Sequence, residues 1–411
     1  MSNEALAKLE HPTLKNLTYI CFMDIAELRS EFIRLFGEGK GEVFEFFAPG
    51  RVNLIGEHTD YNNGYVLPAA LSFGTYLLAR KNDGNTLRLA TTNFEYKAEI
   101  GLGKLAEKHD GEWVNYPLGV INEFNKQMKT IGGLDLYYSG NIPAGAGLSS
   151  SASIELVTAV AINDLYDCGL DTMELIRISL RAEREFVGVQ CGIMDQFIVG
   201  KARKKSALFL NCGTEQFVHV PFTPENYRLV IADTRKVRKL SDSKYNERVA
   251  ECQAGLAAIK QTMHIGSLGE LSIETIDEIL GLIDDAVVRK RVRHIVSENR
   301  RVLDAVKALM NKEFELFGEL MNQSHDSLRD DYEVTGFELD TMVDISRKQD
   351  GVLGSRMTGA GFGGCTVSLL HKDEVDNFMR NVKEDYQKKT GLLPDFYLPG
   401  IVGGAGKVTE L

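Results

Sequence analysis

The sequence lacks any run of eighteen or more apolar residues among its 411, so no membrane-spanning helix is expected. Its N-terminus has no basic start followed by a long apolar stretch, so no signal peptide is predicted. Positive charge is scarce, because 47 Lys and Arg stand against 58 Asp and Glu, for a net charge of −11. Nucleic-acid binding needs a basic surface, so nucleic acid is not expected as a partner.

Cysteine pairs at metal-binding or redox spacing are also absent. The six cysteines are scattered singly, at positions 21, 168, 191, 212, 252 and 365. This excludes a zinc site or redox dithiol of the usual spacing and predicts small buried side chains in a reducing compartment. We therefore expect a cytosolic protein.

What is present is an ordinary globular composition, with 44% hydrophobic and 26% charged residues and a single Trp. The length is sufficient for two domains, each with a full core. Residues 1–22 are polar and have no clear period, which predicts an extension. A helical pattern begins only after Met23 and Asp24.

Strands and helices are mixed in the first half, and amphipathic helices dominate the second. We expect strands at residues 43–47, 75–79, 86–90, 134–138, 206–210, 228–232 and 365–370, and helices at 113–124, 151–166, 171–187, 245–263, 287–309, 313–324, 336–348 and 374–389. The helix over 171–187 has a capping box of Asp171 and Glu174, and Gly188 at its end. This order predicts two α+β domains meeting near residue 200, with the loops around 50, 145, 195 and 360 facing one cleft.

The most informative stretch is the polar segment, residues 49–61, PGRVNLIGEHTDY. The preceding strand is expected to end at Pro49 and Gly50, which would place the polar groups on a loop at a strand end. A solvated turn with a helix cap at Thr59 or Asp60 is the plain alternative. A density of polar groups this high favours a ligand site.

The chemistry of the polar segment suits a polyhydroxyl ligand. Glu57 and Asp60 can each accept two hydroxyl hydrogen bonds. His58 can donate or accept, and Arg51 supplies a fixed fork of donors. A carbohydrate needs such a mixture around its rim, so the segment predicts a sugar site.

A second motif, the serine loop, covers residues 143–153, PAGAGLSSSAS, between a strand and a helix. Its glycines allow backbone N–H groups to approach an anion, and the helix N-terminus adds partial positive charge. Its hydroxyls could bind phosphate oxygens or a metal. The sequence contains no Walker-A pattern, and a serine-rich helix cap is the structural alternative.

Two further stretches carry polar or glycine-rich patterns. Asp195 is a lone carboxylate among apolar residues, and both a helix N-cap and a general base remain open. Spacing alone does not decide whether Glu183 is functional or a solvated surface charge. The glycine loop, residues 354–365, contains G-x-G-x-x-G, but a strand follows it, which excludes a dinucleotide fold. A loop closing over phosphates is favoured over a glycine-lined β-turn.

The polar segment, serine loop and glycine loop together resemble the three motifs of the GHMP kinase superfamily. The polar segment resembles the galactokinase signature in particular, since mevalonate and homoserine kinases lack the Glu-His-Thr-Asp run. Further matches lie at residues 113–116, 191–196, 243–245, 292–295 and 324–333. The resemblance extends over about residues 24–411, and Ala360 departs from it where a third consecutive glycine is common.

The resemblance implies roles for individual residues. It assigns catalysis to Asp195 with Arg51 beside it, and Mg²⁺ binding to Ser151 and Glu183. The sugar pocket implied is Glu57, His58, Thr59, Asp60, Gly192 and Tyr245. The nucleotide site implied is Gly145, Ala146, Gly147, Leu148, Ser149, Ser150 and Ser151, with Trp113 near the adenine and Thr92 beside the nucleotide.

The resemblance also implies a fold and an activity. The fold would be a two-domain, α+β, GHMP-kinase-like architecture with the site between the domains: residues 23–200 with a tail from about 390 to 411, and residues 201–389. The activity would be transfer of phosphate from MgATP to galactose by a monomer, the first committed step of the Leloir pathway. An N-acetylgalactosamine or other sugar-1-kinase and a non-catalytic galactose and ATP sensor are the alternatives. The serine loop of such sensors is altered, whereas Ser151 and Ala152 are retained here.

Overall fold

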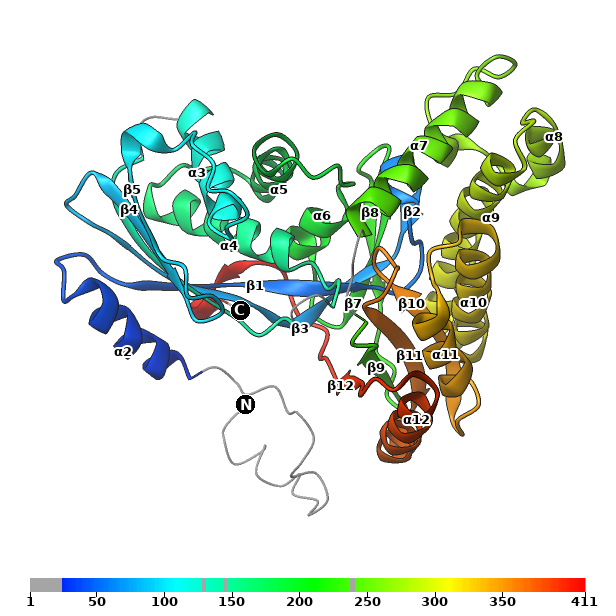
Figure 1. Ribbon diagram of the computed structural model, residues 1–411. Coiled ribbons are helices and arrows are strands. Elements are labelled where there is room, and N and C mark those ends of the chain that lie inside the picture. Colours follow the sequence, from blue (N-terminus) through cyan, green and yellow to red (C-terminus); the bar gives the residue numbers. More distant parts are fainter. Residues whose placement is uncertain (1–23, 128–130, 144–145, 237–240, 411) are drawn as a thin grey trace.

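The computed structural model describes residues 24–127, 131–143, 146–236 and 241–410 (Figure 1). The predicted extension over residues 1–22 and the predicted nucleotide-binding Gly145 lie outside these ranges. Each helix and strand expected from the sequence is present, with ends shifted by a few residues. None of the helices in the described ranges is long and apolar enough to cross a bilayer.

The N-terminal half is built on a six-stranded sheet with the order β13–β1–β3–β6–β4–β5. Its strands are β1 (Phe44–Asn53), β3 (Pro68–Lys81), β4 (Thr86–Thr91), β5 (Ala98–Gly101), β6 (Leu134–Gly140) and β13 (Gly406–Lys407). The strand pairs are antiparallel except for β4 with β6. Helices α3 (Asn115–Gln127), α4 (Ser150–Leu165), α5 (Thr172–Arg181) and α6 (Met194–Lys201) cover one face, and α2 (Ile25–Phe36) covers the other (Figure 1).

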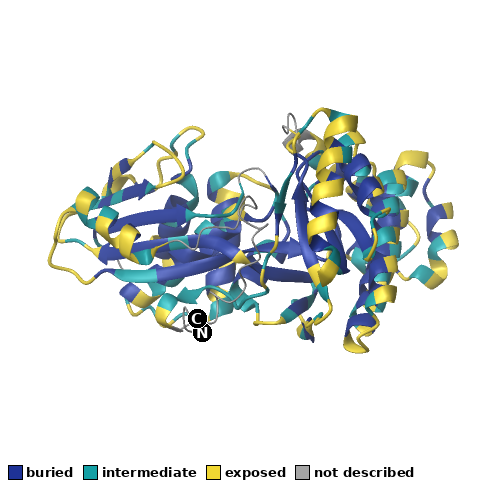
Figure 2. Cartoon of the chain, turned by 90° about the horizontal axis from the view of Figure 1, so that it is seen from below, coloured by how far each residue is buried: buried dark blue, intermediate teal, exposed yellow. Residues whose placement is uncertain are grey.

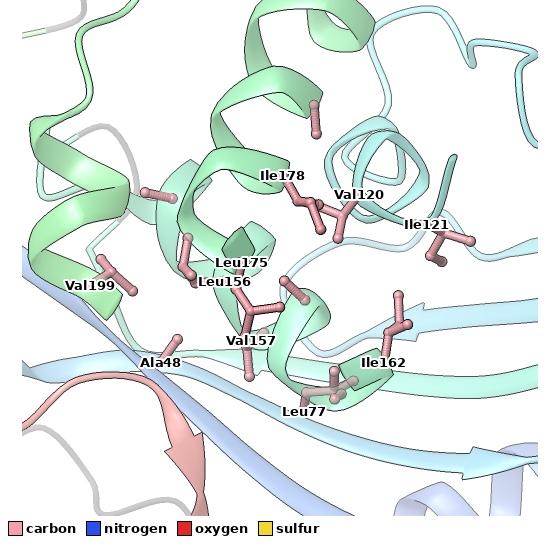
Figure 3. Packing of buried hydrophobic residues seen from close by; sticks show 14 of the residues in the cluster. Ala48, Leu77, Val120, Ile121, Leu156, Val157, Ile162, Leu175, Ile178 and Val199 are labelled. Atoms are coloured by element: carbon pink, nitrogen blue, oxygen red, sulfur yellow. The ribbon is translucent and has the colours of Figure 1, made fainter. Parts of the chain in front are cut away.

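Helix α4 lies at the centre of this half. It is apolar on nearly every side, as expected for a helix that is buried all round. It packs against β1 and β3 and against α3 and α5, and Leu156, Val157 and Ile162 are fully buried there (Figure 3). Burying each such side chain contributes about 1.5–3 kcal/mol. This packing fixes the N-terminus of α4 in space.

The expected end of the first strand at Pro49 and Gly50 is wrong. Strand β1 continues to Asn53, with a register shift between Pro49 and Arg51 that accommodates the missing N–H of proline. A Cβ on Gly50 would lie 2.7 Å from the carbonyl oxygen of Leu148, so the strand approaches the serine loop closely here. Arg51 is therefore carried by a buried strand rather than a loop.

The C-terminal half contains a four-stranded antiparallel sheet with the order β10–β11–β9–β12. Its strands are β9 (Tyr227–Asp233), β10 (Val352–Thr358), β11 (Cys365–His371) and β12 (Asp395–Tyr397). The helices are α7 (Ser241–Ile259), α8 (Ile276–Gly281), α9 (Ala286–Met310), α10 (Phe314–Ser327), α11 (Phe337–Ser346) and α12 (Val375–Thr390). A small sheet of β2 (Tyr65–Val66), β7 (Ser206–Asn211) and β8 (Phe217–Pro221) lies between the halves (Figure 1).

The two halves share a hydrophobic core rather than meeting as separate bodies. Val52 and Leu71 of the N-terminal sheet belong to the same buried cluster as Ile231 and Val367 of the C-terminal sheet. Figure 2 shows the strands buried and the outer helix faces exposed. The walls of the region between the halves are therefore held by common packing.

The C-terminal tail is divided between the sheets. Residues 390–411 were expected to belong to the N-terminal domain, but β12 pairs with β9 in the C-terminal sheet. Further along the tail, Ile401 bridges Leu71 of β3, and β13 pairs with β1 through Phe46 and Phe47. The expectation for the tail is therefore wrong for residues 395–397. Cys168 and Cys191 are half-buried rather than buried, whereas the cysteines at 212, 252 and 365 are buried as expected.

Candidate active site

A cavity of about 500 Å³ lies where the four expected loops come together. The prediction that these loops face one cleft is confirmed. Of the residues singled out from the sequence, those lining the cavity are Arg51, Glu57, His58, Asp60, Ser150, Ser151, Glu183, Gly192, Asp195 and Tyr245. Gly359 and Ala360 bring the glycine loop to the same cavity.

The Arg51–Asp195 pair forms one wall of the cleft. Arg51 donates from Nε and Nη2 to the two carboxylate oxygens of Asp195, at 2.9 and 2.8 Å, a two-pronged geometry that fixes the carboxylate plane. Ser149 Oγ donates to Oδ2 of the same carboxylate at 2.5 Å. The Asp195 side chain remains 27% exposed, so it can meet a ligand in the cleft.

The alternative role for Asp195 as a helix cap does not hold. Helix α6 begins at Met194, its N-cap residue is Ile193, and no side chain caps it. Asp195 therefore lies in the first turn, where the helix dipole favours a negative charge. The carboxylate accepts hydrogen bonds from Arg51 and Ser149 rather than from backbone N–H groups of its own helix.

The polar segment turns sharply after β1. His58 has a left-handed backbone with φ 63°, and Asp60 starts a short 3-10 turn, Asp60–Asn62. Thr59, expected to bind sugar, is fully buried, and its hydroxyl bonds to the carbonyl oxygens of Gly56 and Tyr65, at 2.9 and 2.6 Å. The structure thus places Thr59 as a stabiliser of the turn that presents His58 and Asp60.

Electrostatics distinguish the two titratable groups of this turn. Burial lowers the pKa of His58 to about 3, with His294 adding to the effect, so the imidazole is neutral at physiological pH. Burial, together with the neighbouring carboxylates Asp195 and Glu57, raises the pKa of Asp60 to about 7. A neutral ring and a half-ionised acid offer both donors and acceptors to hydroxyl groups.

Glu57 connects the polar segment to the glycine loop. Its Oε1 accepts from Thr358 Oγ1 at 3.1 Å, from the Gly359 N–H at 2.9 Å and from Arg356 Nη1 at 3.3 Å. Its Oε2 accepts one hydrogen bond, from Asn53 Nδ2 at 3.2 Å. Oε2 therefore keeps the greater capacity for a hydroxyl in the cleft.

Gly192 and Tyr245 complete this side of the cavity. A Cβ on Gly192 would lie 2.0 Å from Asp60 Oδ2, so only glycine allows Asp60 its position. The Tyr245 ring packs against His58 and Tyr61, with centroids 5.7 and 5.3 Å apart. Both residues lie where the sequence expectation requires them, beside the polar groups of the turn.

The serine loop leads into α4. Ala146 and Leu148 are buried in the shared core, and the carbonyl oxygen of Gly147 accepts from Arg51 Nη1 at 2.6 Å. Ser149 precedes the helix with a left-handed φ of 62° and does not cap it with its side chain. The first N–H groups of α4 therefore remain available to an anion at the cleft.

Ser151 and Glu183 carry oxygen atoms that could hold a metal ion. Ser151 lies close enough to the Glu183 carboxylate to act on its pKa, and both residues line the cleft. Burial raises the pKa of Glu183, and the Ser151 hydroxyl acts in the opposite direction. Mg²⁺ prefers one or two carboxylates together with phosphate oxygens and water, and an alcohol and a carboxylate on the serine-loop side fit that pattern.

Of the expected nucleotide contacts, Ser150 and Ser151 line this cavity, whereas Ala146, Gly147, Leu148, Ser149, Thr92 and Trp113 do not. Trp113 is buried in the N-terminal core, where its Nε1 donates to the Tyr96 carbonyl at 3.0 Å. Thr92 shares a 2.7 Å hydrogen bond with Ser139.

Several cavity residues were not assigned roles from the sequence. Tyr116, Gln190 and Asn246 line the cleft. Tyr116 falls within a matched stretch and could have been noticed there. Gln190 and Asn246 carry no local signal. The fully buried Arg356, which contacts Glu57, was also missed, because an arginine in a strand pattern does not reveal a partner 299 residues away.

Three family models match the chain. The galactokinase galactose-binding signature matches residues 30–81, the GHMP kinases N-terminal domain residues 115–201, and the GHMP kinases C-terminal domain residues 305–388. Galactokinase from Clostridium beijerinckii is 46% identical over 94% of this chain and 99% of that protein. Galactokinase from Fusobacterium nucleatum is 48% identical over 90% of this chain and 96% of that protein.

Solved structures agree with these matches. The crystal structure of Lactococcus lactis galactokinase complexed with galactose has a TM-score of 0.91 and 43% identity, covering 93% of this chain and all of that one. Mevalonate kinase from Methanococcus jannaschii, at 20% identity and a TM-score of 0.63, shares the fold over 89% of this chain. The expected two-domain GHMP kinase fold is confirmed, and the chain belongs to the galactokinase family of the GHMP kinase superfamily.

Proposed function

We propose that this chain phosphorylates α-D-galactose at its anomeric hydroxyl, using MgATP and forming α-D-galactose 1-phosphate and ADP. The observation that carries the proposal is the Arg51–Asp195 pair, set between the polar segment and the N-terminus of α4. The names of the relatives and the galactose in the Lactococcus lactis structure support galactose as the sugar.

Asp195 is the group that would receive or orient the anomeric proton. Its carboxylate is fixed by three donors, from Arg51 and Ser149, and still faces the cleft. A fixed carboxylate next to the attacking hydroxyl removes the entropy of alignment from the reaction. As the hydroxyl loses its proton, its oxygen attacks the γ-phosphorus of ATP and the bond to the ADP oxygen breaks.

The other wall of the cleft would bind the phosphates. The N-terminus of α4 offers backbone N–H groups and a partial positive charge to the ADP leaving group. Ser151 and Glu183 would hold Mg²⁺, which would neutralise negative charge on the phosphate oxygens. Phosphoryl transfer has a loose transition state, so positioning and charge neutralisation, here by Arg51, account for most of the catalysis.

We place the enzyme in the cytoplasm, where ATP is available, acting as a monomer. In support, the cleft is lined by residues of this one chain from both halves of the molecule. Sedimentation velocity at assay concentrations tests the monomer.

Coupled ADP release tests the proposed function directly. The purified chain is assayed with MgATP against galactose, N-acetylgalactosamine, glucose, arabinose and mevalonate. Turnover with galactose far above the others supports the proposal. Faster turnover with another sugar keeps the chemistry but overturns the substrate, and galactose binding without ADP release makes the protein a sensor rather than an enzyme.

A further inference from the structure

One oxygen of Glu183 is already occupied by protein donors. Gln196 Nε2 donates to Glu183 Oε2 at 2.5 Å, and Cys191 Sγ donates to the same oxygen at 3.3 Å. Neither donor is paired in this way with Oε1. The two oxygens of the carboxylate are therefore not equivalent.

Gln196 holds this position through a second hydrogen bond. The same Nε2 donates to Glu155 Oε2 at 3.1 Å, so one amide nitrogen spans two carboxyl groups. Gln196 and Glu155 are both fully buried, and Glu183 is only 5% exposed. Both hydrogens of the amide are thus used, and a buried side chain with two fixed bonds has little rotational freedom.

Three separate elements converge on this bridge. Glu155 comes from α4, the helix that follows the serine loop, and Gln196 comes from α6. Glu183 lies in a wide π-helical turn, Ala182–Val187, that follows α5. Such turns change the direction of side chains relative to a regular helix and recur at functional sites. The bridge connects this wide turn to the two helices that carry Ser151 and Asp195.

The neutral amide is chemically suited to its place. A Lys or Arg at position 196 would form an ion pair with Glu183 and cancel the charge that attracts a cation. An acidic residue would add repulsion to a site that already holds Glu155 and Glu183. Glutamine supplies a donor and leaves the charge of Glu183 available.

We propose that Gln196 is a positioning residue that reserves Oε2 of Glu183 and so presents Oε1 to the magnesium of MgATP. This inference rests on the proposed function, because it assigns the metal of that reaction to Ser151 and Glu183. Partners that orient a metal-binding carboxylate typically contribute 10–100-fold to metal affinity. Cys191, a weak donor, assists in the same role.

The test measures metal binding rather than turnover. Mn²⁺ is titrated into the full-length protein saturated with a non-hydrolysable ATP analogue, and water-proton relaxation reports enzyme-bound Mn²⁺. The Gln196→Met variant keeps the side-chain length and removes both donated bonds. We expect its Kd for Mn²⁺ to rise about tenfold or more, with galactose affinity by calorimetry unchanged.

A matched control separates positioning from stability. Asn163, also in the N-terminal half, bonds to the backbone N–H and carbonyl of Leu170 and has no bond to Glu183. Asn163→Leu should lower the melting temperature and leave Mn²⁺ affinity unchanged. If Gln196→Met does not fold, Cys191→Ala takes its place, with an expected rise of about two- to threefold, since a thiol is a weak donor.

The outcomes distinguish this inference from the proposed function. Wild-type protein that binds no Mn²⁺ with the nucleotide would overturn the metal site and the inference together. Wild-type binding with an unchanged Kd in Gln196→Met would overturn the positioning role alone. So would a variant whose galactose affinity falls as much as its Mn²⁺ affinity, since that pattern indicates general damage to the cleft.

Discussion

Asp60→Asn is expected to stabilise the ligand-free protein more at high pH than at low pH. The unfolded chain releases the Asp60 proton near the ordinary pKa of 3.8, whereas burial holds the folded-state pKa at about 7. Between these values the folded state binds more protons, so the wild type loses stability as pH rises, and the loss is complete above pH 7. Between pH 5 and the folded-state pKa of about 7 lie about two pH units. At about 1.4 kcal/mol per unit, the wild type loses about 3 kcal/mol of its free energy of unfolding over this interval.

Calorimetric melting at pH 5, 6, 7 and 8 without galactose measures this effect. The unfolding entropy is about 2.1 cal/mol/K per residue. For a chain of this length, a change of about 3 kcal/mol in the free energy of unfolding therefore shifts the melting temperature by about 3 °C. The figure is an upper value, because Asp60 is only partly buried and solvent screens its charge. Asp110→Asn, at an exposed position, is the control and should show no such trend. A difference between Asp60→Asn and wild type that is the same at pH 5 and pH 8 would refute the assignment of a raised pKa to Asp60.

Three other substitutions test the site. Asp195→Asn should leave calorimetric galactose binding nearly intact and lower turnover by about 10²–10⁴-fold, and substantial activity would make Asp195 a positioning residue instead. Arg51→Lys loses the two-pronged contact with Asp195, so kcat in the coupled assay should fall at least about tenfold, and an unchanged kcat contradicts this role. Gly192→Ala places a methyl group 2.0 Å from Asp60 Oδ2, so KM for galactose should rise with little change in melting temperature; an unchanged KM would show that Asp60 does not depend on this approach.

Sequence patterns predicted much of the fold because most elements carry local signals. The capping box at Asp171 and Glu174 is present as expected. The end of β1 was mispredicted because Pro49 and Gly50 usually terminate strands, whereas here close packing against Leu148 and a register shift keep the strand continuous. Such a contact between distant segments has no local trace in the sequence.

The site was predicted where motif and chemistry coincided, as at Arg51 and Asp195. Residue spacing could not reveal that the Thr59 hydroxyl is already hydrogen-bonded to carbonyl oxygens of its own turn. Nor could it reveal that the Trp113 indole N–H donates to the Tyr96 carbonyl oxygen. Gln196 lies within a matched stretch, but the sequence indicates no role for it, because its significance depends on Glu155 and Glu183, which lie on other helices. Roles that arise from tertiary hydrogen bonds are visible only in the folded structure.

The division of the C-terminal tail between two sheets has a consequence for protein synthesis. The first long strand, β1, receives its edge partner β13 only from residues 406 and 407, and the C-terminal sheet receives β12 from residues 395–397. A ribosome makes these segments after the other strands of both sheets, so each sheet must wait for residues 395–407 before it can be completed. Loss of this segment would leave an unpaired edge in each half, and unpaired edges recruit other chains. Both halves of the molecule therefore depend on one short segment for an edge strand.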